Sequence, residues 1–272
     1  MKFDIEFVGK VGSIALLNEE RTAIDHKKLK QLASALRPGY VWVTSGAVEI
    51  GKLDYFNRTG RFLEDTEESK NDYAGQGQSI LMTKYREYID QKYSTRQILL
   101  EHFHLNDSAK RQHLRDLLLR CPKQNAIPII NYNDTISSVE NRKMEIATLA
   151  KYQEVHECVD NDETASQIAC LLKSKYLVIF TSVDGIYLDH TDKNTLIQKI
   201  SGKNCYELVE NIEHYKQFCI GSSRKGANGA GHKLEYIKPA AMQGTTIYIA
   251  NSKYSIEEVL SEKIACTKIC VE

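Results

Sequence analysis

Residues 176–187 read YLVIFTSVDGIY, an apolar run that ends in a polar turn. The run at 176–180 is typical of a strand that is buried on both faces, and Asp184-Gly185 is a strong turn signal. Because such strands occur in parallel sheets that are covered by helices, this stretch predicts an α/β fold.

Outward from this run, short apolar stretches alternate with helical patterns along most of the chain. Further strands are expected at residues 5–8, 40–43, 97–100, 126–130 and 246–250. Helices are expected with Asp25 and Asn106 as their N-caps, the first ended by Pro38-Gly39, and another is expected over residues 234–241. The acidic stretch 57–72 is predicted to be a mobile surface loop. This alternation predicts a mostly parallel sheet with helices on both faces.

The composition predicts a soluble, cytoplasmic protein. The 272 residues include 36 Lys and Arg and 36 Asp and Glu, so the chain has no global field that would attract nucleic acid or an anionic membrane. No stretch approaches the roughly 18 apolar residues of a membrane span, and the start, MKFDIEF, lacks the pattern of a signal peptide. The seven cysteines form no CxxC motif and are expected to be reduced thiols.

In open parallel sheets, ligands bind in the loops that follow the strands. Lys10, Gly12 and Ser13 follow the first strand, where glycine would let the backbone approach a phosphate and lysine would add a cation. Residues 44–47, TSGA, follow the second strand and offer helix N–H groups to an anion. A plain turn and a plain helix cap are the respective alternatives.

Polar side chains also follow the run at 126–130 and precede a later helix. Residues 131–134, NYND, could bind an ammonium and a carboxylate together, or form an Asx turn. Residues 160–162, DND, could order cationic side chains around a phosphoryl group, or simply begin a helix with acidic residues.

A glycine-rich segment, GANGAGHK at residues 226–233, precedes the last predicted helix. Three glycines and Lys233 suggest a phosphate cradle, although the segment lacks the spacing of a Walker A loop. A flexible loop without a ligand is the alternative.

The order of these motifs resembles the signature set of the glutamate 5-kinase family. KVGS, TSGA, GQSILM at 77–82, PIINYND at 128–134, DND, TSVDGIY and GANGAGHK follow one another over about residues 5–250. The resemblance implies the amino-acid kinase fold, a three-layer α/β/α sandwich around a mostly parallel eight-stranded sheet. It implies one kinase domain, 1–272, with an acceptor lobe at about 1–172 and a nucleotide lobe at about 173–272. The chain resembles the shorter form of the family that lacks a PUA domain.

The resemblance also implies residue roles. Lys10 and Lys233 would stabilise the transferring phosphoryl group, and Asp162 would orient them. The positions implied on the nucleotide side are Lys10, Gly12, Ser13, Thr181, Ser182, Gly229 and Lys233. The positions implied on the acceptor side are Ser45, Gly46, Ala47, Asn131, Asp134, Asp160 and Asn161.

The implied reaction is the ATP-dependent phosphorylation of the side-chain carboxylate of L-glutamate to γ-glutamyl phosphate, the first step of proline biosynthesis. A carboxylate is already ionised at neutral pH, so this acceptor needs no general base. ATP and Mg²⁺ are the expected cofactors, with no metal site made by protein side chains. A homo-oligomer without nucleic-acid or membrane partners is expected.

The sequence departs from the family pattern at several positions. Tyr132 replaces a glutamate, Ser182 replaces an aspartate, and Ala230 and His232 replace a methionine and a threonine. Asp134 and Asp160 lie 26 positions apart, and residues 141–158 are predicted to form an inserted helix beside the acceptor site. Two alternatives therefore stay open: a relative that phosphorylates a different small acid, and a catalytically silent nucleotide-binding protein.

Overall fold

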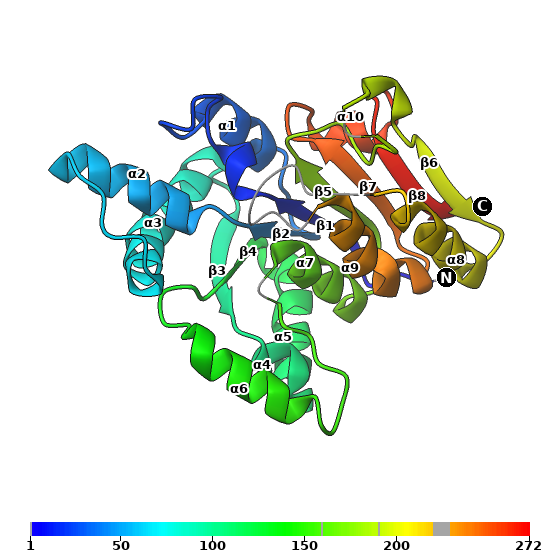
Figure 1. Cartoon of the computed structure of the whole chain (residues 1–272), viewed down its shortest axis with the longest axis horizontal. Coiled ribbons are helices and arrows are strands. Elements are labelled where there is room, and N and C mark those ends of the chain that lie inside the picture. Colours follow the sequence, from blue (N-terminus) through cyan, green and yellow to red (C-terminus); the bar gives the residue numbers. More distant parts are fainter. Residues whose placement is uncertain (1, 159, 190, 220–228) are drawn as a thin grey trace. The chain divides into compact units, whose positions relative to one another are not determined.

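The computed structural model describes residues 2–158, 160–189, 191–219 and 229–272. The fold is α/β, with eight strands in a mostly parallel sheet and helices on both of its sides (Figure 1). The strand order is β3-β4-β2-β1-β5-β7-β8-β6. The predicted fold class is confirmed.

The chain divides into two compact units. Unit 1 comprises Met1–Lys10 and Asp162–Glu272, and unit 2 is the continuous stretch Val11–Asn161. The assignment of an acceptor lobe and a nucleotide lobe to residues 1–172 and 173–272 stays a prediction.

Unit 2 contains three parallel strands, with β4 paired to both β2 and β3. All seven residues of β4 are buried, which is why its sequence, AIPIINY, is almost continuously apolar. The strands are β2 (Tyr40–Thr44), β3 (Ser94–Leu100) and β4 (Ala126–Tyr132). The helices are α1 (His26–Ser34), α2 (Ala47–Thr59), α3 (Glu67–Tyr88), α4 (Phe103–Asn106), α5 (Ser108–Arg120) and α6 (Val139–Leu149), with short 3₁₀ helices at Ser13–Leu16 and Pro122–Gln124.

Unit 1 contains the other strands, and the predicted run at 176–180 is the buried centre of its β5. β5 pairs with β7 and β6 pairs with β8 in parallel, whereas β7 and β8 are antiparallel. The strands are β1 (Ile5–Val11, whose last residue belongs to unit 2), β5 (Ser174–Thr181), β6 (Lys199–Gly202), β7 (Thr246–Asn251) and β8 (Thr267–Val271). The helices are α7 (Asn161–Leu171, which begins at the boundary), α8 (Cys205–Lys216), α9 (Ala230–Met242) and α10 (Ile256–Leu260), with a 3₁₀ turn at Lys193–Thr195.

Two local predictions were wrong. The stretch 57–72 is not one loop, because α2 continues to Thr59 and α3 begins at Glu67. The side chain of Thr66 accepts a hydrogen bond from the backbone N–H of Ser69, so an N-cap starts α3 inside the acidic stretch. Asn106 ends α4, and it is Asp107 that caps α5 by accepting from Lys110 N.

Two glycines allow α2 and α3 to pack against each other at backbone distance. A Cβ atom on Gly51 would lie 1.8 Å from the carbonyl oxygen of Tyr73, and one on Gly77 would lie 1.8 Å from that of Ala47. Any side chain at either position would push the helices apart. The glycine of the predicted GQ motif is therefore required by helix packing.

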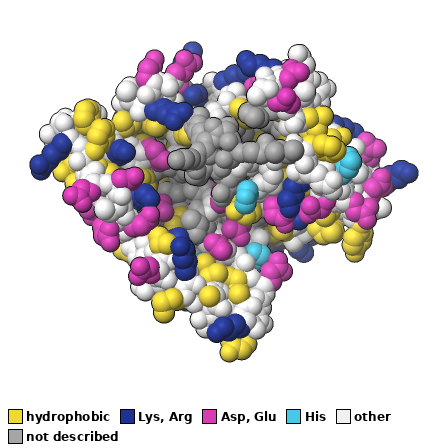
Figure 2. Space-filling view, in the orientation of Figure 1, with side chains coloured by type: hydrophobic (Ala, Val, Ile, Leu, Met, Phe, Trp, Pro, Cys, Tyr) yellow, Lys and Arg dark blue, Asp and Glu magenta, His cyan; other side chains and the backbone are white. Residues whose placement is uncertain are grey.

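Charges of both signs are interspersed over the face of the protein that Figure 2 shows. In the part of the chain that the structure describes, no helix combines the length and apolar character needed to cross a membrane. All seven cysteines fall in this part and none forms a disulfide, which agrees with the prediction of reduced thiols.

Candidate functional site

Unit 1 brings together Lys10, Asp162 and Lys233, the three residues predicted to be catalytic. Lys10 lies in β1 and is 7% exposed, and Asp162, in the first turn of α7, is 2% exposed. Lys10 Nζ lies 2.6 Å from Asp162 Oδ1, and Lys233 Nζ, from the first turn of α9, forms an ion pair with Asp162 Oδ2. A single buried carboxylate therefore orients two ammonium groups that come from opposite ends of the chain.

The charges of this cluster stabilise one another. Burial opposes the ionisation of Asp162, but the positive charges of Lys10 and Lys233 more than compensate and lower the pKa of the carboxyl to about 2. The cluster carries two positive charges and one negative charge, so it retains a net positive charge. Such a group is suited to stabilise an anion, for example a phosphoryl group in transfer.

The residues predicted on the nucleotide side of unit 1 lie at the ends of its strands. Thr181 ends β5, and its Oγ1 accepts from the backbone N–H of Val183 at 3.1 Å. The carbonyl of the exposed Ser182 accepts from Asn251 Nδ2 at the end of β7. Gly229 directly precedes α9, whereas residues 226–228 of the glycine-rich segment lie outside the described residues. The roles of these residues stay predictions.

Unit 2 brings the predicted acceptor residues into a network of amide side chains. Asn161 Nδ2 donates to Ser45 Oγ at 2.7 Å and lies 3.4 Å from Asn131 Oδ1. Asn131 Nδ2 donates in turn to Gln78 Oε1 at 2.9 Å, and Asn131 is 2% exposed. Within the described residues, the buried atoms Asn161 Oδ1 and Gln78 Nε2 have no hydrogen-bond partner. Buried polar groups are rarely left unpaired, so one acceptor and one donor remain available for a ligand here.

The start of α2 completes this region. Gly46 has a φ of 103° and lies just before Ala47, the first residue of the helix. Residues with side chains rarely adopt this backbone conformation, so the turn from β2 into α2 depends on glycine. No side chain of the described residues caps this helix end, which leaves its N–H groups available. Gly12 and Ser13, at the start of the first 3₁₀ helix, are half-buried, as is Asp160 just before α7.

Asp134 is a half-buried carboxylate two residues beyond the end of β4. Burial and the nearby charge of Glu49 raise its pKa to about 6, although Arg142 acts in the opposite direction. No ion pair within the described residues involves Asp134. An ammonium group bound here would offset the repulsion between Asp134 and Glu49. This arrangement is compatible with the prediction that Asp134 binds the acceptor.

Three residues that lie near the predicted acceptor positions were not predicted from the sequence. Gln78 belongs to the quoted GQ motif, but its contact with Asn131 was not anticipated. Glu49 lies one turn into α2, and its charge acts on Asp134. Arg142 lies in the inserted helix, which the family pattern does not cover. The GQ motif could have identified Gln78, whereas no sequence motif pointed to Glu49 or Arg142.

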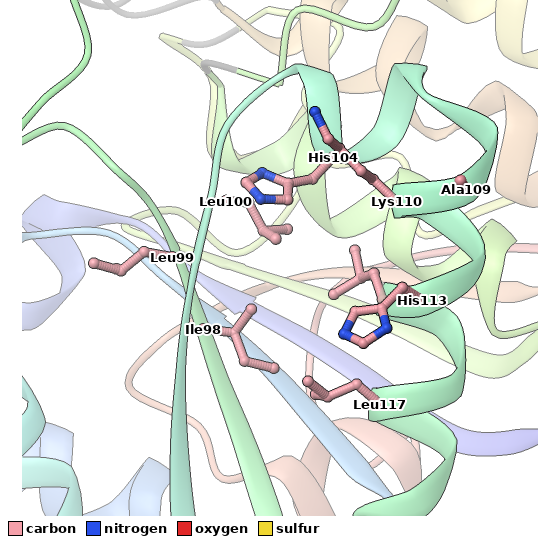
Figure 3. Close-up of a pocket in the computed structure, with 9 residues that line it drawn as sticks. Ile98, Leu99, Leu100, His104, Ala109, Lys110, His113 and Leu117 are labelled. Carbon is pink, nitrogen blue, oxygen red and sulfur yellow. The ribbon is translucent and has the colours of Figure 1, made fainter.

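Unit 2 also contains a cavity of about 500 Å³ between β3 and α5. Ile98 and Leu117 contribute to its apolar lining, whereas His104, Lys110 and His113 add basic groups (Figure 3). No predicted site residue lines it. Its apolar character distinguishes it from the polar acceptor network.

Comparison with known proteins gives a consistent result. The model of the amino acid kinase family matches residues 7–251. A glutamate 5-kinase from Streptococcus suis is 31% identical over 255 residues, which cover 90% of this chain and 64% of that protein. A glutamate 5-kinase from Neisseria gonorrhoeae is 30% identical over 82% of this chain and 69% of its own length. The chain thus spans about two thirds or less of several such relatives.

The fold also matches solved structures. A carbamate kinase from Giardia lamblia, solved with AMP-PNP, aligns over 98% of this chain and 99% of its own length with a TM-score of 0.62. Its sequence identity is 15%, so this similarity concerns the fold alone.

Proposed function

Because the chain belongs to the amino acid kinase family, we propose that it transfers the γ-phosphoryl group of ATP to the side-chain carboxylate of an amino acid. L-glutamate is the proposed acceptor and γ-glutamyl phosphate the product, since several relatives at about 30% identity are glutamate 5-kinases.

The observation that carries the proposal is the Lys10–Asp162–Lys233 cluster. Both lysines form ion pairs with Asp162, which keeps them at defined positions. Charge that develops on a transferring phosphoryl group would be stabilised by groups that are already oriented, with no reorganisation during the step. The polypeptide connects this cluster directly to the acceptor network, because Asn161 and Asp162 are consecutive residues.

In the proposed step, a γ-carboxylate oxygen of glutamate attacks the γ-phosphorus, and the bond between this phosphorus and the bridging oxygen breaks. ADP leaves with the electron pair of that bond, and the product is an acyl phosphate. The carboxylate enters already ionised, so no side chain has to remove a proton. The role of the protein is therefore alignment and electrostatic stabilisation.

Other features of the proposal follow from this chemistry. Mg²⁺ would be bound mainly by the nucleotide phosphates, where it would neutralise their charge; no three His, Cys, Asp or Glu side chains converge on a metal-sized site within the described ranges. We assign the product to proline biosynthesis and expect the protein to be a homo-oligomer. We place the protein in the cytoplasm, where cysteines without disulfides are usual.

The test is ATP turnover with Mg²⁺ across glutamate, aspartate and related acids, with hydroxylamine trapping any acyl phosphate. Hydroxamate formed with glutamate supports the proposal. Nucleotide binding without turnover of any acid contradicts it and favours a silent binding protein. Full activity in excess chelator would contradict the role of Mg²⁺.

One observation favours a second candidate, phosphorylation of a different small acid. Tyr132 is 3% exposed at the end of β4, where the family has a glutamate, and the inserted α6 contacts it through Arg142. Turnover with another acid and not with glutamate would select this candidate.

A further inference from the structure

The inserted helix α6 has one charged residue on its inner face. No residue of α6 is buried, but Val139, Arg142, Ile146 and Leu149 are half-buried, whereas the other residues of the helix are exposed. Their spacing of three and four positions defines one stripe along the helix. Three of the four are apolar, so Arg142 is the exception.

Arg142 contacts the end of β4 through the ring of Tyr132. Its guanidinium carbon lies 5.7 Å from the centroid of the Tyr132 ring, and its Nη1 donates to Ser137 Oγ at 3.1 Å. Ser137 Oγ also lies 3.3 Å from the hydroxyl of Tyr132, so the local hydrogen bonds fix the position of the guanidinium. Among the residues that the structure describes, no ion pair involves Arg142, and most of its five N–H donors are uncommitted.

Arg142 and Asp134 form a pair of opposite charges that do not neutralise each other. The positive charge of Arg142 lowers the pKa of Asp134, yet the two side chains form no ion pair within 4.0 Å. A cation and an anion that interact but form no ion pair offer one binding group for each charge of a zwitterionic amino acid head group. The ammonium group would bind Asp134, and the carboxylate would bind the planar guanidinium.

We propose that Arg142 binds the α-carboxylate of the acceptor, so that α6 restricts the substrates to acids that carry an α-amino acid head group. This inference rests on the proposed function, because it assigns the acceptor to this side of unit 2. It explains why the inserted segment contributes a half-buried arginine that forms no ion pair with any described residue.

The test compares L-glutamate with its α-amide, which keeps the ammonium and the γ-carboxylate but lacks the α-carboxylate charge. Arg142→Met keeps much of the side-chain length and removes the charge. We expect it to lower kcat/KM for glutamate about 10–100-fold and kcat/KM for the α-amide less than about threefold. Arg142→Lys should recover part of the loss. Lys143→Met, on the exposed face of the same helix, is the matched control and should leave kcat/KM unchanged for both substrates.

Equal losses for glutamate and the α-amide would show that Arg142 only supports the fold, and would overturn the inference. Calorimetric binding of glutamate to the unmodified protein and to Arg142→Met separates the two proposals. Binding that is lost in the variant, without turnover by either protein, would contradict the kinase function and support the role of Arg142. Failure of the unmodified protein to bind glutamate would overturn the role of Arg142.

Discussion

Asp162 in unit 1 is buried and Asp134 in unit 2 is half-buried, and the charges around the two carboxylates differ. Asp162 contacts two lysines, which lower its pKa to about 2. No lysine or arginine of the described ranges lies within ion-pair distance of Asp134, and burial together with Glu49 raises its pKa to about 6. The first carboxylate is compensated by the protein itself, whereas the second is not.

The difference separates two uses of a carboxylate. A compensated aspartate is a positioning group, because its charge is already used to orient Lys10 and Lys233. An uncompensated aspartate is suited to bind a cation, since the ligand would supply the missing positive charge. Removing each group should therefore have different effects on kcat, KM and stability.

The largest expected effect is on kcat when the compensating cations are removed. Lys10→Ala and Lys233→Ala should each lower kcat about 10²–10³-fold, because each lysine would stabilise charge that develops in the transition state. Lys238→Ala is the control, since Lys238 lies on the same helix as Lys233 but pairs with Glu213 and Glu235. Steady-state kinetics and thermal unfolding of all three variants check this. A Lys233→Ala enzyme with normal kcat would exclude α9 from the mechanism.

The next effect is on acceptor binding when the uncompensated carboxylate is neutralised. Asp134→Asn should weaken binding of the acceptor by about 2–4 kcal/mol, which corresponds to about 30-fold or more in KM. Its effect on kcat should be smaller, because the ammonium would be bound equally in the ground state and the transition state. An unchanged KM would mean that the acceptor does not bind at Asp134.

A smaller effect is expected from pH. Asp134 must be ionised to bind an ammonium, so KM should rise about tenfold per pH unit as the pH falls below about 6. Asp162 stays ionised in this range because its pKa is about 2, so protonation of Asp162 should not lower kcat. KM measured from pH 5 to 8 tests this, and the dependence should disappear in Asp134→Asn.

The smallest effect is on stability. Replacing Asp134 or Asp162 by asparagine should change the free energy of unfolding in opposite directions. The pKa of Asp134 is raised by folding, so its stabilising contribution at low pH is lost as the pH rises from about 4 through 6. Asp134→Asn should therefore raise the unfolding free energy by about 1–2 kcal/mol at pH 8 and leave it unchanged at pH 4. The pKa of Asp162 is lowered, so its contribution is present above pH 4, and Asp162→Asn should destabilise at pH 8. Denaturant titrations of both variants at pH 4 and pH 8 measure these changes. A change of the same sign for both variants at pH 8 would contradict the prediction.

Much of the fold could be predicted because its strands are continuous apolar runs. The run at 176–180 and the runs at 5–8, 40–43, 97–100, 126–130 and 246–250 all lie in strands of the structure. β6 and β8 were missed, because each is only four or five residues long and the sequence of β6, KISG, contains few apolar residues.

The candidate site could be predicted in part. Motifs in the sequence identified Lys10, Asp162 and Lys233, and the ion pairs among them agree with a shared role, although that role stays a prediction. The amide network was harder to predict, because Gln78 lies in α3, 53 positions before Asn131 in the chain. Such contacts depend on how α3 packs, and local sequence patterns do not specify it.

The insertion shows why a family pattern also misses residues. The helix expected within residues 141–158 is present as α6, but it ends at Leu149 and the described part of the remaining segment is not helical. In Figure 1, α6 lies beside α4, and Glu145 contacts the buried His102 that precedes α4 at 3.0 Å. Neither this contact nor the position of Arg142 follows from a motif, because the family pattern has no counterpart for the segment.

The composition of unit 1 from two separate segments has a consequence for the order of events during translation. Ribosomes add about 5–20 residues per second, so residues 11–161 take about 8–30 s to be made after the first ten. All of unit 2 is synthesised in that interval, and its continuous chain allows it to fold first. The pairing of β1 with β5, and the ion pair of Lys10 with Asp162 in α7, must wait until those later elements have been made. Lys10 is thus among the first residues to be synthesised and among the last to reach its folded surroundings.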